Sequence, residues 1–83
     1  MDPEQIASMI MAGLPGADVV VLSEDNTHYE ARVVAEQFHD KRSLSRHQLV
    51  YGCLGEAMGR EIHALSLQTF SPAEWAAKQA QEG

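Results

Sequence analysis

The sequence predicts an α+β domain in which a three-stranded mixed sheet is covered by helices. Three short segments, 17–22, 28–35 and 62–70, have the β-branched composition or the alternation of strands. Segments with helical spacing lie before the first strand, between the second and third, and after the third, which gives the order α-β-β-α-β-α. Because a helix separates the second strand from the third, we expect these two strands to be parallel and joined by a right-handed crossover.

The N-terminal half is predicted to be a helix followed by a hairpin. Asp2 is a suitable N-cap and Pro3 a suitable first helical residue. Ile6, Met9 and Ile10 then form one apolar stripe, and the helix is expected to end near Gly13 and Pro15. The polar turn 23–26 is expected to join the first two strands in an antiparallel hairpin.

The second helix is expected to begin after the polar segment 38–44, a loop or single helical turn. Ser43 or Ser45 is the expected cap, and the helix should run to about Met58, with Gly59 as its C-cap. Its expected apolar face consists of residues spaced by three or one: His47, Val50, Tyr51, Leu54, Ala57 and Met58.

The last helix has a compact start signal. Ser71 is the expected N-cap, Pro72 the first helical residue and Glu74 the third, as in a capping box. The helix carries Trp75 and is expected to fray over residues 79–83. With 83 residues and no interdomain linker, we expect residues 1–83 to form one domain.

The composition limits the classes of function. The net charge of −6 disfavours general affinity for nucleic acid or anionic membranes, and no apolar run approaches membrane-spanning length. The single cysteine, Cys53, allows no internal disulfide and fits a reducing compartment. The N-terminal residues lack the pattern of a signal peptide, so we expect a cytoplasmic protein. No nucleophile–base constellation or Gly-rich phosphate loop is present, so we do not expect an enzyme.

His28 and His63 are the most informative polar residues. Each is predicted to open a strand, and parallel neighbours start at the same end of a sheet, with strands about 5 Å apart. The two imidazoles are therefore candidates for a joint metal or cofactor site. The structural alternatives are a hydrogen-bonded histidine at the edge of the core for His63 and an exposed loop histidine for His28. His63 is the better candidate, because a strand positions a ligand more rigidly than the polar turn before His28.

A basic stretch permits an alternative interpretation. Lys41, Arg42 and Arg46 make up half of the Lys and Arg residues and lead into a helix N-terminus, which favours anions. They are the candidate nucleic-acid-binding residues of a transcriptional regulator. The opposing interpretation is a solvated loop paired with carboxylates, and no aromatic side chains interleave these residues to stack on bases.

Three segments resemble the BolA-like protein family. They are RSLSRHQLVYGCL (42–54), IHALSLQTFSPAEW (62–75) and the D-x-T-H-Y pattern of residues 25–29, the last of which resembles the YrbA-like or IbaG-like subgroup. The resemblance covers nearly the whole chain and implies a class II KH-like fold. The G-x-x-G signature of class I KH domains is absent, which the family fold does not require.

The resemblance also implies a partner and a cofactor. It implies a heterodimer with a monothiol glutaredoxin that shares a [2Fe–2S] cluster, for which the glutaredoxin and its glutathione supply thiolates. The family's C-terminal histidine ligand falls on His63, and its second candidate ligand, in the loop between the first two strands, falls most simply on His28. Because one cysteine cannot complete the coordination, we expect the isolated chain to bind no cluster. We also expect it to be a monomer when alone.

Overall fold

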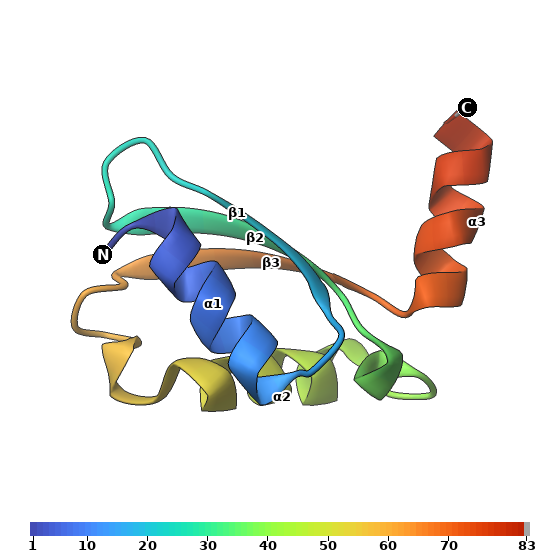
Figure 1. Cartoon of the computed structure of the whole chain (residues 1–83), viewed down its shortest axis with the longest axis horizontal. Helices are drawn as coiled ribbons and strands as arrows, with labels where there is room; N and C mark the ends of the chain where they lie inside the picture. Colours follow the sequence, from blue (N-terminus) through green and yellow to red (C-terminus); the bar gives the residue numbers. More distant parts are fainter. Residues whose placement is uncertain (83) are drawn as a thin grey trace.

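The computed structural model describes residues 1–82, which form a sheet with the first two α-helices packed on one face (Figure 1). The elements follow one another along the chain as α1 (Pro3–Gly13), β1 (Asp18–Leu22), β2 (His28–Val34), η1 (Glu36–Phe38), α2 (Ser43–Leu54), η2 (Gly55–Ala57), β3 (Ala64–Phe70) and α3 (Pro72–Glu82). The predicted order α-β-β-α-β-α is confirmed, with two short 3₁₀ helices added.

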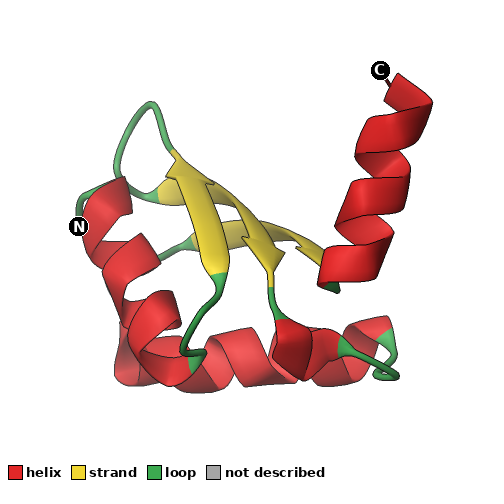
Figure 2. Ribbon diagram, turned by 45° about the vertical axis from the view of Figure 1, so that its right-hand side comes forward, coloured by secondary structure: helices red, strands yellow, loops and turns green. Residues whose placement is uncertain are grey.

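The sheet has β2 at its centre (Figure 2). β1 pairs with it antiparallel, as expected for a hairpin, and β3 pairs with it parallel. The parallel register runs from His28 opposite Ala64 to Val34 opposite Phe70. The mixed sheet is therefore confirmed, and the starts of β2 and β3 share one end of it.

The core lies between one face of the sheet and helices α1 and α2. Tyr29, Ala31 and Val33 alternate along β2 and are buried, whereas His28 before them and Glu30 between them are exposed. The remaining core side chains come mainly from the two helices and the connections: Ile6, Ile10, Leu14, Ala35, Phe38, Val50, Leu54, Ala57 and Ile62. Leu65 and Leu67 of β3 pack against this cluster, as the alternation predicts.

Helices α1 and α2 approach closely at Gly13. A Cβ atom at this position would lie 2.4 Å from Cys53 Sγ, so a larger residue would force the sulfur to move. At the other end of α1, Gln5 Oε1 accepts a hydrogen bond from the N–H of Asp2 at 2.7 Å. The predicted start of the first helix, with Asp2 as N-cap and Pro3 following, is confirmed.

Helix α2 differs from the prediction at both ends. It ends at Leu54 rather than Met58, because Gly55 has φ 56° and ψ −131° and the chain continues as a 3₁₀ turn. Its N-cap is Arg42, with no side-chain cap, rather than a serine. Its buried residues are Arg46, Val50 and Leu54, whereas Tyr51 is 40% exposed.

Helix α3 begins as predicted. The N–H of Ser71 donates to Glu74 Oε1 at 2.8 Å, and the N–H of Glu74 donates to Ser71 Oγ at 3.2 Å, which forms the expected capping box. Trp75 packs against Phe70, with ring centroids 5.1 Å apart, and the Arg32 guanidinium lies 4.4 Å from the Trp75 ring centroid.

The C-terminal part of α3 projects away from the sheet (Figures 1 and 2). The helix continues to Glu82, so residues 79–82, which were expected to fray, are helical, and Gly83 lies outside the described residues. Over residues 1–82, none of the helices has the length and hydropathy needed to cross a membrane.

Candidate functional site

The two predicted histidines lie at the same end of the sheet. His28 is the first residue of β2 and pairs with Ala64, the first residue of β3. His63 directly precedes Ala64, and its N–H donates to the Thr27 carbonyl oxygen at 2.9 Å. Both histidines are exposed. The crossover helix therefore brings two imidazoles that are distant in sequence to neighbouring backbone positions.

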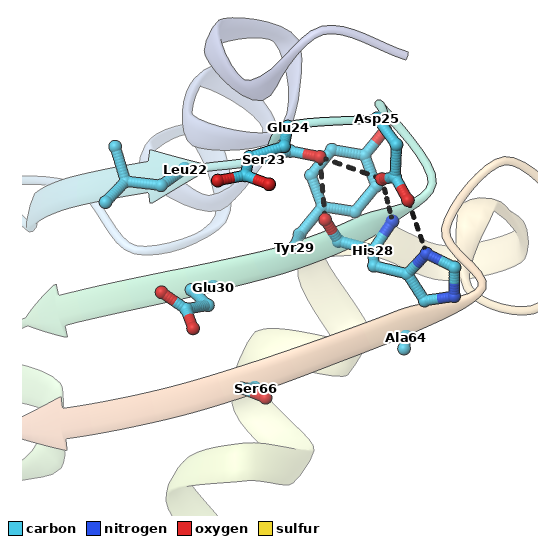
Figure 3. Close-up of a pocket in the computed structure, with 9 residues that line it drawn as sticks. All are labelled: Leu22, Ser23, Glu24, Asp25, His28, Tyr29, Glu30, Ala64 and Ser66. Carbon is cyan, nitrogen blue, oxygen red and sulfur yellow. Dashed lines mark hydrogen bonds and ion pairs between the residues drawn. The ribbon is translucent and has the colours of Figure 1, made fainter.

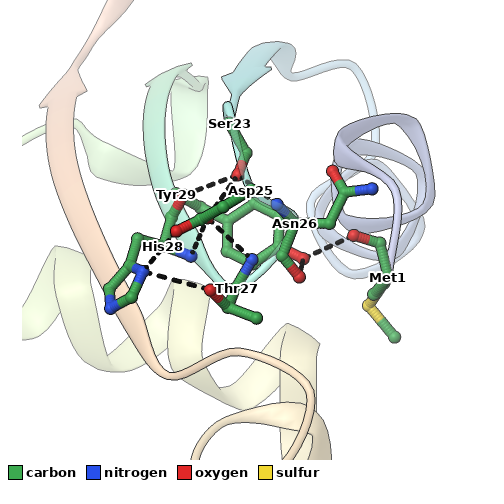
Figure 4. Close-up of polar contacts among 7 residues, drawn as sticks. All are labelled: Met1, Ser23, Asp25, Asn26, Thr27, His28 and Tyr29. Carbon is green, nitrogen blue, oxygen red and sulfur yellow. Dashed lines mark hydrogen bonds and ion pairs between the residues drawn. The ribbon is translucent and has the colours of Figure 1, made fainter.

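The turn before His28 is held by a dense set of hydrogen bonds (Figure 4). Asp25 Oδ1 accepts the N–H groups of Thr27 at 3.0 Å and His28 at 2.9 Å. The Ser23 hydroxyl donates to the His28 carbonyl at 2.6 Å and accepts the N–H of Asn26 at 2.9 Å. Composition suggests a mobile turn, but these side-chain bonds to the backbone fix its shape.

The His28 imidazole is oriented through one of its two nitrogens (Figure 3). Nδ1 lies 2.7 Å from Asp25 Oδ2 (Figure 3) and 3.1 Å from Thr27 Oγ1 (Figure 4). Hydrogen bonds from the backbone N–H and then the imidazole of His28 hold the pKa of Asp25 well below its usual range. An ionised carboxylate at Nδ1 selects the tautomer that carries its proton there. Nε2, which has no partner within residues 1–82, is then left with a free lone pair.

Tyr29 holds the same turn from the core side of the sheet. Its side chain is buried, and its hydroxyl lies within hydrogen-bond distance of the carbonyl oxygens of Met1 and Asn26. Burial raises the pKa of this phenol, so it is a neutral donor. Asn26 has φ 58°, a left-handed conformation that asparagine tolerates. The turn is thus connected to the N-terminus of the chain.

An open pocket of about 640 Å³ lies beside His28 on the exposed face of the sheet (Figure 3). The carboxylates of Glu24, Asp25 and Glu30 line it together with Leu22, which is 61% exposed. Within residues 1–82, no three His, Cys, Asp or Glu side chains form a set that could hold a metal ion. A metal group bound here by His28 would therefore need ligands from a second molecule.

His63 is placed differently from the prediction. It lies one residue before β3 rather than at its start, and its imidazole makes no hydrogen bond to residues 1–82. The sequence favoured His63 as the more rigidly held ligand, whereas the structure fixes the side chain of His28. The sequence feature that indicates a fixed His28 is Asp25, an acidic residue three positions before it in the hairpin turn. Asp25 was not among the predicted site residues.

The three basic candidates are not equivalent. Lys41 and Arg42 are exposed and form no ion pair with residues 1–82. Arg46, which was expected beside them on the surface, is instead buried, with only 8% exposed, and its guanidinium forms a bidentate ion pair with Glu74 at 2.6 and 3.3 Å. Its spacing of four from Val50 places it on the core face of α2. Arg46 is therefore not available to contact a phosphate.

Cys53 is half-buried against α1 and belongs to no group of three metal-ligating side chains within residues 1–82. Its Sγ donates to the Leu49 carbonyl at 3.2 Å, and burial raises its pKa. The thiol is thus disfavoured as a thiolate ligand.

A family model, a relative in sequence and a solved structure all point to the same protein family. The family model for BolA-like proteins matches residues 11–74. The acid stress protein IbaG of Escherichia coli is 36% identical over 77 residues, which cover 92% of this chain and 90% of that protein. The solved structure of a bolA protein homologue from Coxiella burnetii has a TM-score of 0.81 and 38% identity, and covers 92% of this chain and 97% of that chain.

Two further relatives match over a shorter segment. The DNA-binding transcriptional regulator BolA of Haemophilus influenzae is 38% identical over 52 residues, which cover 63% of this chain and 50% of that protein. BolA-like protein 1 of Homo sapiens is 41% identical over 49 residues, 59% of this chain. The chain thus spans half of the first of these proteins and 36% of the second.

Proposed function

This chain belongs to the BolA-like protein family, and we propose that it is a non-enzymatic cytoplasmic adaptor that binds a monothiol glutaredoxin. Together the two proteins would hold a [2Fe–2S] cluster, with histidine from this chain and thiolates from the glutaredoxin and its glutathione. The role would be cluster trafficking or sensing of iron and redox state. Such an adaptor needs ligand side chains that are exposed and oriented, and that do not by themselves complete the coordination of the cluster.

The orientation of His28 is the observation that carries this proposal. Asp25 Oδ2 lies 2.7 Å from Nδ1, and Nε2 has no partner within residues 1–82. Histidines that bind metals commonly donate their second ring N–H to a carboxylate, which fixes the tautomer and the orientation of the ring. His28 already has this arrangement.

The donor set also fits a shared cluster. A [2Fe–2S] cluster takes four ligands, and histidine can replace cysteine on one iron, which raises its potential. This chain offers His28 and His63 at one end of the sheet, whereas its single cysteine is a half-buried thiol packed against α1. The missing ligands would be thiolates of a partner.

Ligand substitution tests the proposal. The chain is mixed with a monothiol glutaredoxin, glutathione and iron–sulfur reagents, and the visible circular dichroism of the complex is recorded. We expect His28→Ala and His63→Ala to change this spectrum. The matched control is His39→Ala, an exposed histidine beyond the other end of β2, which should not change it. If neither His28→Ala nor His63→Ala changed the spectrum, the proposal would be contradicted.

Asp25 provides a sharper test, because it orients the ligand without being one. Asp25→Asn should make the cluster complex about tenfold less stable, the usual cost of losing an outer-shell carboxylate. The matched control is Asp40→Asn, which alters the exposed pair between His39 and Asp40. Equal effects of the two substitutions would show that orientation of His28 has no role. Far-ultraviolet spectra check that each variant is folded.

A second candidate function is nucleic-acid binding. Relatives in Haemophilus influenzae and Escherichia coli are named as DNA-binding transcriptional regulators, and Lys41 and Arg42 are exposed at the N-terminus of α2. With Arg46 buried, two phosphate contacts remain, so the logarithm of affinity should fall with the logarithm of salt with a slope of about 2. Lys41→Ala combined with Arg42→Ala should abolish retention on DNA, whereas His28→Ala should leave it unchanged.

A further inference from the structure

The outward face of helix α2 carries exposed apolar side chains. Leu44 is 70% exposed, Tyr51 40% and Leu49 36%. The opposite side of the helix, with Val50 and Leu54, packs into the core. The figures show α2 at the margin of the fold, with the sheet on one side of it and no other element beyond (Figures 1 and 2). This face is therefore uncovered in the single chain.

A glycine on the same face has no explanation within the chain. Gly52 is inside α2, where glycine is a poor helix former, and its φ is not positive. A Cβ at this position would have no neighbour within 4 Å. Neither backbone conformation nor internal packing requires glycine here. A glycine would be required if the backbone of another chain approached α2 closely at this position.

Gly52 also completes a hole of the kind that receives a side chain in helix packing. Ser45, Gln48, Leu49 and Gly52 are spaced by three, one and three residues, which is the arrangement of four residues around such a hole. A shallow groove of about 290 Å³ is lined by Ser45, Gln48 and Leu49 together with Lys41. The face thus combines a depression with an exposed leucine.

The charges on this face are complementary between its two ends. Lys41 and Arg42 lie at the N-terminal end of α2 and have no ion pair within residues 1–82. Glu56 follows the C-terminal end and makes only an exposed contact of 3.8 Å with Arg60. An antiparallel copy of the helix would place its acidic end beside this basic end, with opposed helix dipoles. The face is therefore suited to a second copy of itself.

We propose that α2 packs antiparallel against α2 of a second copy of this chain, about a two-fold axis near Gln48. Leu44 and Gly52 each lie four residues from Gln48, so Leu44 of one chain would cover Gly52 of the second copy. Lys41 would face Glu56 of the second copy. Such an interface is isologous and closes at the dimer. It leaves the His28 end of the sheet free and does not depend on the proposed function.

The size of the face sets the strength of the dimer. A helix of 12 residues is about 18 Å long, and one helical face buries less than the roughly 800 Å² per partner of a standard interface. We therefore expect a monomer–dimer equilibrium that depends on concentration. This differs from the monomer expected from the sequence.

Sedimentation velocity over a wide concentration range tests the proposal. The weight-average mass of the wild-type chain should rise toward that of a dimer, and Gly52→Leu should weaken association by about tenfold or more by filling the hole. The matched control is Ser8→Leu, the addition of a leucine to an exposed position of α1, which should leave association unchanged. A wild-type chain that stays monomeric at millimolar concentration would overturn the proposal, as would undiminished association of Gly52→Leu.

A charge exchange tests the antiparallel geometry. Lys41→Glu alone and Glu56→Lys alone should each weaken the dimer at low salt, because each places like charges together. The double variant should recover association, because the swapped charges face each other again across the two-fold axis. Failure of the double variant to recover, with far-ultraviolet spectra showing a folded chain, would exclude this geometry.

Discussion

At each end of the parallel strands β2 and β3, a carboxylate is paired with a nitrogen-bearing side chain, and the two pairs are used differently. At the starting end, Asp25 and His28 form a pair with side chains 53% and 66% exposed. At the finishing end, Arg46 and Glu74 form a pair in which the Arg46 side chain is 10% exposed. The first pair leaves Nε2 of the His28 imidazole without a partner within residues 1–82, whereas the second uses the Arg46 guanidinium to join elements. The exposed pair, Asp25 with His28, is therefore a candidate binding site, whereas the pair with the buried arginine, Arg46 with Glu74, is a structural joint.

The joint at the finishing end connects three elements. Arg46 of α2 donates through Nε to the Lys41 carbonyl at 2.7 Å and through Nη1 to the Thr69 carbonyl of β3 at 3.3 Å. Its ion pair with Glu74 adds α3. These bonds leave Arg46 no freedom to bind an external partner. Substitutions at the two ends should consequently differ in kind: at one end they should affect stability, and at the other ligand chemistry.

The largest effect is expected for Arg46→Ala. It removes a buried guanidinium and all its hydrogen bonds, so the free energy of unfolding should fall by about 2–3 kcal/mol. The matched control is Arg42→Ala, an exposed arginine that should stay within about 0.5 kcal/mol of wild type. Urea denaturation measures both. Equal, small effects would show that Arg46 is not a structural residue.

Glu74→Gln should change the acid dependence of stability. The Arg46 side chain, and next the Ser71 N–H, lower the pKa of Glu74 from 4.5 to about 2. A lowered folded-state pKa adds stability above pH 4.5 that is lost as the pH falls toward 2, so wild-type stability should decline over this window. Glu74→Gln should flatten the decline in urea denaturation between these pH values. Glu24→Gln, a turn residue with no hydrogen bond or ion pair within residues 1–82, should retain it.

Tyr29→Phe should have a moderate effect at the starting end. It removes the hydroxyl that reaches the carbonyl oxygens of Met1 and Asn26, and a buried hydrogen bond of this kind contributes about 1 kcal/mol. The matched control is Tyr51→Phe, at an exposed tyrosine of α2, which should cost almost nothing. Thermal unfolding of the two variants gives the comparison. Equal midpoints would indicate that the turn does not need this anchor.

The smallest effect on stability is expected for His28→Ala. The side chain is exposed and Asp25 keeps its hydrogen bonds from the backbone N–H groups of residues 27 and 28, so the free energy of unfolding should change by less than about 0.5 kcal/mol. The same substitution is expected to alter the spectrum of the glutaredoxin complex. A large loss of stability in urea denaturation would make His28 a structural residue like Arg46.

Of three predictions that differ from the structure, only one, the partner of Arg46, depends on a contact between distant residues. Arg46 was grouped with Lys41 and Arg42 by adjacency, although its spacing from Val50 and Leu54 already put it on the core face of α2. Its partner Glu74 belongs to another helix and was assigned only a capping role, which it also has. The end of α2 was misplaced because the apolar spacing continues past Gly55, where the backbone changes direction.

The sequence by itself determined the architecture and the placement of the two histidines at one end of the sheet. Alternation in residues 28–35 and the helix between the second and third strands are local patterns, and they suffice to place His28 and His63 at one end of the sheet. Only the tertiary structure decided which histidine is held, which of its nitrogens is free, and that Arg46 pairs with Glu74. The physical reason is that strand pairing follows from periodicity and connection length, whereas the environment of a side chain depends on the groups that the finished fold brings to it.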